Sequence, residues 1–139
     1  QAYRMVYILR TEDGGIDKVI LPIEGYGLWS TLYGFIALEE NGNDIFGLQF
    51  YQHGETPGLG AEVDNPRWKA LWNGKKLRDD DGDLQITVAK APPPAGQEFY
   101  IDALAGATLT SRGVHNLVRF WMGEQGYGPF LERLKAGEI

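Results

Sequence analysis

Hydrophobic and polar residues alternate in short runs over the first half of the chain, and this pattern predicts β-strands. The runs are rich in β-branched and aromatic residues and are separated by turn residues, a combination typical of strands. They cover residues 3–9, 17–23, 32–39 and 44–51. Asn41-Gly42, between the last two runs, is a strong hairpin signal. The first half is therefore expected to form an antiparallel sheet.

Helical periodicity appears in the second half. Asn65-Pro66 supplies an N-cap and a first-turn proline, which predicts a helix to about Trp72. Apolar residues at helical spacing predict a second helix over 111–122, which Gly123 ends. A third, short helix is expected after Gly128-Pro129.

Two more strands are expected, at 84–89 and 97–103, on either side of the loop 91–96 (APPPAG). The order of elements predicts an α+β fold, a mostly antiparallel twisted sheet with helices inserted and appended. The length of 139 residues fits a single domain, 1–139.

The composition excludes several classes of function for this chain. Thirteen Lys and Arg against 19 Asp and Glu give a net charge of −6, without a basic run. Nucleic acid is therefore excluded as a partner. The absence of cysteine excludes thiol nucleophiles, disulfides and iron–sulfur clusters, and the two histidines lack metal-ligand spacing. No run of about 20 apolar residues predicts a membrane span.

Two segments partly match known ligand-binding motifs but depart from them at required positions. In the acidic run 79–83, Gly82 at position 6 of a calcium loop puts Leu77 at position 1 and Val88 at position 12, so a solvated turn is expected. The run 25–30 begins like a dinucleotide fingerprint, but Ser30 replaces the third glycine and a strand follows instead of a helix.

Three segments remain as candidate binding or catalytic sites. Residues 25–30 (GYGLWS) predict a loop that lies close to a flat ligand or buries Trp29 in the core. Residues 53–60 (HGETPGLG) combine polar side chains with glycines that permit close backbone approach. Residues 105–111 (AGATLTS) place small residues and then hydroxyls at a helix start, where a phosphate is favoured. The run Ala-Gly-Ala clears space around Thr108, whose hydroxyl could become a phosphoester.

Together these segments resemble the FMN-binding domain of the C subunit of the Na+-translocating NADH:quinone oxidoreductase and of related Rnf-type subunits. The resemblance covers nearly the whole chain, through 27–34 (GLWSTLYG), 53–60 and 102–108 (DALAGAT). The last segment matches the family's Asp-x-x-Ser/Thr-Gly-Ala-Thr flavinylation motif. It departs from that motif at Ala105, where the family usually has Ser or Thr, and this change could alter the efficiency of flavinylation.

The resemblance implies covalent FMN on Thr108, placed there by a separate flavin transferase that uses FAD and Mg2+ and releases AMP. It implies that Leu28, Trp29 and Leu59 pack against the flavin ring, and that Glu55 and Thr56 hydrogen-bond near the ribityl chain or ring edge. Amides of 109–111 would support the phosphate, and Lys90 could stabilise the phosphate or the reduced flavin. The implied cofactor site comprises Thr108, Leu28, Trp29, Glu55, Thr56, Leu59, Gly60, Lys90, Gly106, Ala107, Leu109 and Thr110.

The resemblance also implies a place in the cell. The flavin would relay electrons among the other subunits of a membrane NADH:quinone oxidoreductase, on the periplasmic side of the inner membrane. The NADH site would lie on another chain. The family's N-terminal transmembrane anchor is absent from these residues, which implies a soluble fragment.

Two other readings stay open. A noncatalytic binding module could present Trp29, Tyr51 and Trp72 to a small aromatic or sugar ligand. A hydrolase could use Thr108, Thr110 or Ser111 as nucleophile, with His53 or His115 as the base.

Overall fold

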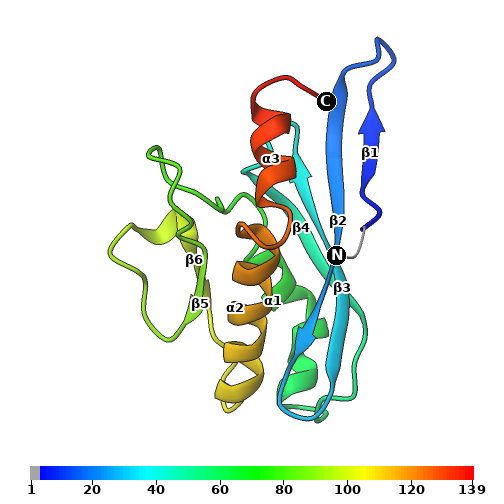
Figure 1. Cartoon of the computed structure of the whole chain (residues 1–139). Helices are drawn as coiled ribbons and strands as arrows, with labels where there is room; N and C mark the ends of the chain where they lie inside the picture. Colours follow the sequence, from blue (N-terminus) through cyan, green and yellow to red (C-terminus); the bar gives the residue numbers. More distant parts are fainter. Residues whose placement is uncertain (1–3) are drawn as a thin grey trace.

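A computed structural model describes residues 4–139 (Figure 1). Its main sheet has the strand order β1-β2-β3-β4, with every neighbouring pair antiparallel. The strands are β1 (Tyr7–Arg10), β2 (Ile16–Tyr26), β3 (Thr31–Glu39) and β4 (Ile45–Gln52). The predicted antiparallel sheet is confirmed, as is the hairpin at Asn41-Gly42. The predicted first strand began at residue 3, which lies outside the described residues.

The helices lie mainly in the second half. The short 3-10 helix η1 (Gly60–Asp64) precedes α1 (Pro66–Ala70), and the side chain of Asn65 caps α1 by accepting from Arg67 N. Helices α2 (Thr108–Met122) and α3 (Gly128–Lys135) follow. Helix α2 begins three residues before the predicted start, because the Ser111 amide already bonds to Ala107 O.

The two short strands form a separate pair, and here the prediction was partly wrong. Only β5 (Thr87–Ala89) and β6 (Tyr100–Asp102) are strands, and they pair in parallel. Residues 97–99 form the 3-10 helix η2 (Gln97–Phe99). Leu84 makes only an isolated bridge with Arg78, and the amides of 85 and 86 both donate to Leu77 O. Residues 84–86 are therefore bonded to Leu77 and Arg78 across the turn at 79–83, and not through a strand ladder.

Helix α2 lies between the main sheet and the β5–β6 pair (Figure 1). The sheet buries alternate side chains against it, among them Val19, Leu21 and Ile23 of β2. The helix contributes Val114, Leu117, Val118 and Met122 at helical spacing. This is the period-2 and period-3.6 pattern that the sequence predicts.

Two glycines let α2 approach the end of β2 closely. A Cβ on Gly113 would lie 2.2 Å from the carbonyl oxygen of Tyr26 and 3.0 Å from Cα of Gly27. A Cβ on Gly25 would lie 2.4 Å from Leu117 Cβ. These glycines let α2 pack directly on the end of β2 and on the β2–β3 turn, and this packing brings the turn next to the start of the helix.

Candidate flavin site

All three segments singled out by the sequence meet at one end of the molecule, the lower end in Figure 1. They are the β2–β3 turn at 27–30, the segment 53–60 after β4, and the start of α2. Hydrogen bonds join all three through one carboxylate, that of Glu55. Segments that are some 25 and 55 positions apart in the chain are thereby brought into one unit.

The Glu55 carboxylate accepts four hydrogen bonds. Oε1 accepts from the amide of Leu28 (2.9 Å) and from the hydroxyl of Thr110 (2.7 Å). Oε2 accepts from the amide of Trp29 (3.1 Å) and from the hydroxyl of Ser30 (2.7 Å). Because each oxygen bonds to two donors, the carboxylate fixes the turn 27–30 relative to the first turn of α2.

Burial and hydrogen bonding act on Glu55 in opposite directions. The side chain is only 5% exposed, and burial by itself raises the pKa of a carboxyl group. The four donors stabilise the charged form and outweigh burial, so the pKa falls from 4.5 to about 2. Glu55 is therefore an anion at neutral pH, and its four donors among the described residues are all neutral.

Space around this carboxylate is tight. A Cβ on Gly27 would lie 2.8 Å from Cδ of Glu55, and a Cβ on Gly60 would lie 2.6 Å from Oγ1 of Thr110. Both glycines come from segments that the sequence singled out. Their role here is to let the Glu55–Thr110 contact form.

The segment that precedes α2 is a tight turn. Ala107 N–H donates to Leu104 O (3.2 Å), and Gly106 has φ of +72°, a value that favours glycine at the third position of a type II turn. Ala107 is buried, whereas Thr108, the first residue of α2, is exposed. The turn therefore presents the Thr108 side chain to solvent at a helix N-terminus.

This N-terminus lacks a side-chain cap among the residues that the structure describes. The first backbone bond at this end runs from Ser111 N–H to Ala107 O (3.0 Å), so the three amides before it have no partner within the helix. The expectation that the Ser111 amide supports a phosphate was therefore wrong, because that amide already bonds to Ala107. Free amides and the helix dipole together favour a negatively charged group. The start of α2 can therefore support a phosphate.

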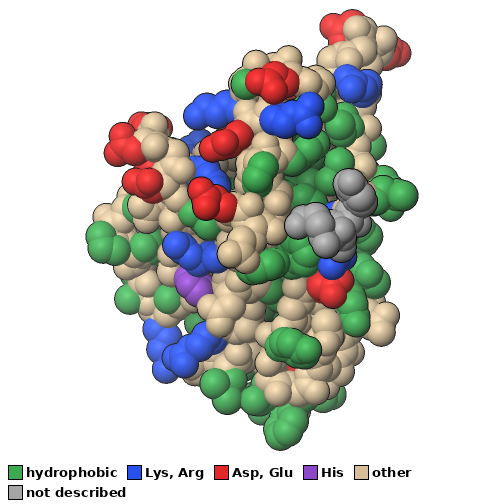
Figure 2. Space-filling view, in the orientation of Figure 1, with side chains coloured by type: hydrophobic (Ala, Val, Ile, Leu, Met, Phe, Trp, Pro, Cys, Tyr) green, Lys and Arg blue, Asp and Glu red, His purple; other side chains and the backbone are tan. Residues whose placement is uncertain are grey.

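Large apolar side chains are exposed to solvent around this helix start. Trp29 is 70% exposed and Leu109 54%, and the same end also exposes Leu28, Leu59 and Tyr26. Figure 2 shows apolar side chains projecting at this lower end of the molecule. The core alternative for Trp29 was therefore wrong. A cluster of this kind is typical of a surface that receives a flat apolar ligand.

The remaining predicted residues lie close to this arrangement. A Cβ on Gly106 would lie 3.4 Å from Cδ2 of Leu59, which places the segment 53–60 against the turn. Lys90 is exposed and directly follows β5, whose last residue, Ala89, is in register with Asp102. Thr56 is exposed, and its carbonyl oxygen accepts from the amides of residues 59 and 61.

Sequence reasoning missed the roles of two hydroxyl residues, Ser30 and Ser111. Ser30 Oγ donates to Glu55 and accepts from Gly54 N (2.8 Å). Ser111 Oγ accepts from Leu104 N and donates to Ala107 O, each at 2.9 Å. Both residues belong to the segments that the sequence singled out, but spacing alone does not indicate that Ser30 bonds to Glu55 or that Ser111 accepts from the Leu104 amide.

The hydrolase alternative finds no support in the geometry. His115 Nδ1 accepts from Val88 N (3.0 Å), and His53 Nε2 bonds to Asp64 (2.8 Å). Ser111 is 2% exposed, and its hydroxyl is engaged with backbone groups. Within residues 4–139, no hydrogen bond joins either histidine to a candidate nucleophile.

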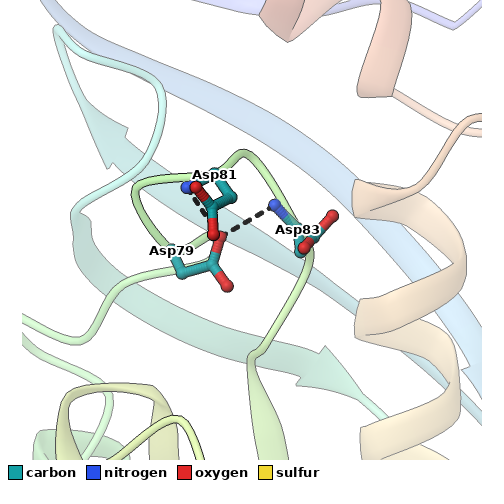
Figure 3. A group of neighbouring side chains, drawn as sticks. All are labelled: Asp79, Asp81 and Asp83. Atoms are coloured by element: carbon teal, nitrogen blue, oxygen red, sulfur yellow. Dashed lines mark hydrogen bonds between the residues drawn. The ribbon is translucent and has the colours of Figure 1, made fainter.

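The acidic turn at 79–83 gathers three carboxylates (Figure 3). Oxygens of Asp79, Asp81 and Asp83 lie within 4.8 Å of one another. Asp79 Oδ1 accepts from the amides of Asp81 and Asp83, and Oδ2 accepts from Gln85. These hydrogen bonds hold the pKa of Asp79 below its usual value. This is the turn chemistry that the sequence predicts.

Comparison with known proteins identifies the class. A family model described as an FMN-binding domain matches residues 27–123, a stretch that runs from the β2–β3 turn through the end of α2. It includes every segment of the candidate site. The chain belongs to the FMN-binding domain family.

Two curated relatives from different organisms carry the same name. The chain is 55% identical over 141 residues to the C subunit of the Na(+)-translocating NADH-quinone reductase of Pseudomonas aeruginosa, a match that covers 99% of this chain and 54% of that protein. The corresponding C subunit of Vibrio anguillarum is 50% identical over 135 residues, with coverages of 97% and 52%. The crystal structure of Shewanella oneidensis NqrC matches with a TM-score of 0.86 at 41% identity, covering 96% of this chain and 61% of that one.

The chain spans about half the length of the curated relatives it matches. In the described range 4–139, none of the helices combines the length and apolar character needed to cross a membrane.

Proposed function

We propose that this chain carries FMN as a phosphoester on Thr108 and relays electrons as part of the C subunit of a Na+-translocating NADH:quinone oxidoreductase. The observation that carries the proposal is the exposed Thr108 at the uncapped start of α2. Membership of the FMN-binding domain family and the similarity to named C subunits support it.

The residues present fit FMN. The uncapped amides of α2 suit its phosphate, and the small residues Gly106 and Ala107 leave the Thr108 hydroxyl accessible. The exposed side chains of Leu28, Trp29 and Leu59 offer apolar surface for the flavin ring. When bound, the flavin supplies the electron-transfer chemistry. In this proposal Glu55 holds the turn 27–30 against α2, and Lys90 adds positive charge beside the acceptor segment.

Attachment would need a flavin transferase with FAD and Mg2+. A bond forms between Thr108 Oγ and the FMN phosphorus while the pyrophosphate bond of FAD breaks. AMP leaves, and the threonine proton passes to a base of the transferase. The partners in electron transfer would be other subunits of the membrane complex on the periplasmic side. An Rnf-type complex is the alternative host.

The test is intact mass after co-expression with a flavin transferase. The parent should gain one FMN residue, Thr108→Ala should gain none, and Thr11→Ala, in an exposed turn far from the site, should behave as the parent. A parent that gains no mass, with a transferase that modifies another acceptor, would contradict the covalent carrier and favour a noncovalent binding module.

A further inference from the structure

Ser111 stands out as a buried hydroxyl placed next to the proposed acceptor. It lies three residues after Thr108 and is 2% exposed. Its Oγ accepts from the amide of Leu104 and donates to the carbonyl of Ala107, both at 2.9 Å. One side chain thus joins the first and last residues of the turn 104–107.

A helical serine that bonds to the carbonyl four residues earlier is common and implies no function by itself. The second bond is what differs here. If the Ser111 hydroxyl were removed, the amide of Leu104 would lose its acceptor. Because Leu104 is only 7% exposed, water could not easily replace that acceptor. Because a buried unpaired amide is costly, the turn would shift to find another partner.

The segment before the turn is anchored separately. The indole N–H of Trp68 donates to Asp102 O (2.7 Å), and the amide of Ala103 donates to Ala89 O (2.9 Å). Across the described residues, Ser111 makes the side-chain hydrogen bonds to the backbone of 104–107. The path of the chain into Thr108 therefore depends on this hydroxyl.

We propose that Ser111 is a positioning residue for phosphoester formation at Thr108, a role that rests on the function proposed above. In that reaction the Thr108 oxygen must stand in line with the pyrophosphate bond of FAD that breaks, with AMP as the leaving group. Ser111 takes no part in the bond changes. It holds the turn so that the Thr108 hydroxyl is presented in one orientation, and a misplacement of about 1 Å can slow such a transfer by about 100-fold.

The test compares Ser111→Thr with Ser111→Val, two side chains of nearly the same shape that differ in the hydroxyl. The rate of FMN incorporation is measured by mass with a flavin transferase, FAD and Mg2+, on folded protein. Ser111→Thr should keep a rate within about threefold of the parent, and Ser111→Val should lose about tenfold or more, in kcat and not in the KM for FAD. Ser111→Ala, which adds no volume, should show the same loss as Ser111→Val and serves if neither larger side chain folds.

A stability control separates positioning from general weakening. Leu131→Ala removes a buried side chain in α3, away from the acceptor, and should leave the transfer rate within about threefold of the parent. Equal rates for the Thr and Val variants, or an equal loss in Leu131→Ala at matched stability, would overturn the role of Ser111. A parent that takes up no FMN would instead overturn the proposed function, and with it this role.

Discussion

Replacing Glu55 by Gln changes the carboxylate whose hydrogen bonds join all three segments of the site. Gln offers a single acceptor oxygen where the carboxylate offers two, and its NH2 group would face two of the four donors. A hydroxyl donor can rotate to accept from this NH2 group, but a backbone amide such as that of Trp29 cannot. The variant therefore leaves one partly buried amide without an acceptor and loses the charge that strengthens the other bonds.

The pKa of Glu55 gives the magnitude of the expected loss of stability. A fall from 4.5 to about 2 corresponds to about 3 kcal/mol of stability at neutral pH. Glu55→Gln should therefore lower the free energy of unfolding by about 3 kcal/mol at pH 7, or the Tm by roughly 10 °C for a chain of this size. The stabilisation is fully present above about pH 4.5 and is lost as the pH falls toward about 2. The difference between parent and variant should shrink over this window.

The assay is thermal or urea unfolding of parent and variant from pH 7 to pH 3. Glu124→Gln changes an exposed carboxylate in the turn after α2 and should stay within about 0.5 kcal/mol of the parent. A Glu55→Gln variant as stable as the parent, or one whose deficit is the same at pH 7 and pH 3, would refute the reasoning.

Two further changes probe the packing of α2. Gly113→Ala should cost about 2 kcal/mol in urea unfolding, because the clash with the Tyr26 carbonyl exceeds the gain in helix propensity. Gly47→Ala is the control and should cost under about 1 kcal/mol, because the nearest described atom, Asn73 Oδ1, would lie 3.8 Å from the added Cβ. Equal costs for the two variants would contradict this reasoning. Burial, with nearby Arg119, lowers the pKa of His115, so its contribution is complete above its unfolded-state pKa and is lost as the pH falls through the folded value. His115→Gln should therefore flatten the decline in stability between pH 8 and pH 5, and an unchanged decline would show that another group causes it.

The sequence by itself determined the features that depend on neighbouring residues. Alternation and Asn41-Gly42 predicted the central hairpin, because register in a hairpin follows from the turn and from side-chain alternation. Asn65-Pro66 predicted the start of α1 through local cap geometry. The resemblance predicted the FMN-binding family from the residues of its motifs, which the comparisons bear out.

Only the tertiary structure decided which groups meet. Strand β5 packs against α2 and pairs in parallel with β6, and three-residue strands carry too little pattern to predict this pairing. Glu55 was predicted as a residue near the flavin, but its four donors come from segments that only the fold brings together. Ser111 was counted as part of a helix start, and its hydroxyl instead closes the turn before Thr108. Sequence patterns reveal the period of an element and the residues of a turn. A hydrogen bond between distant segments depends instead on how closely their backbones pack. In this protein, glycines without a Cβ allow that close packing.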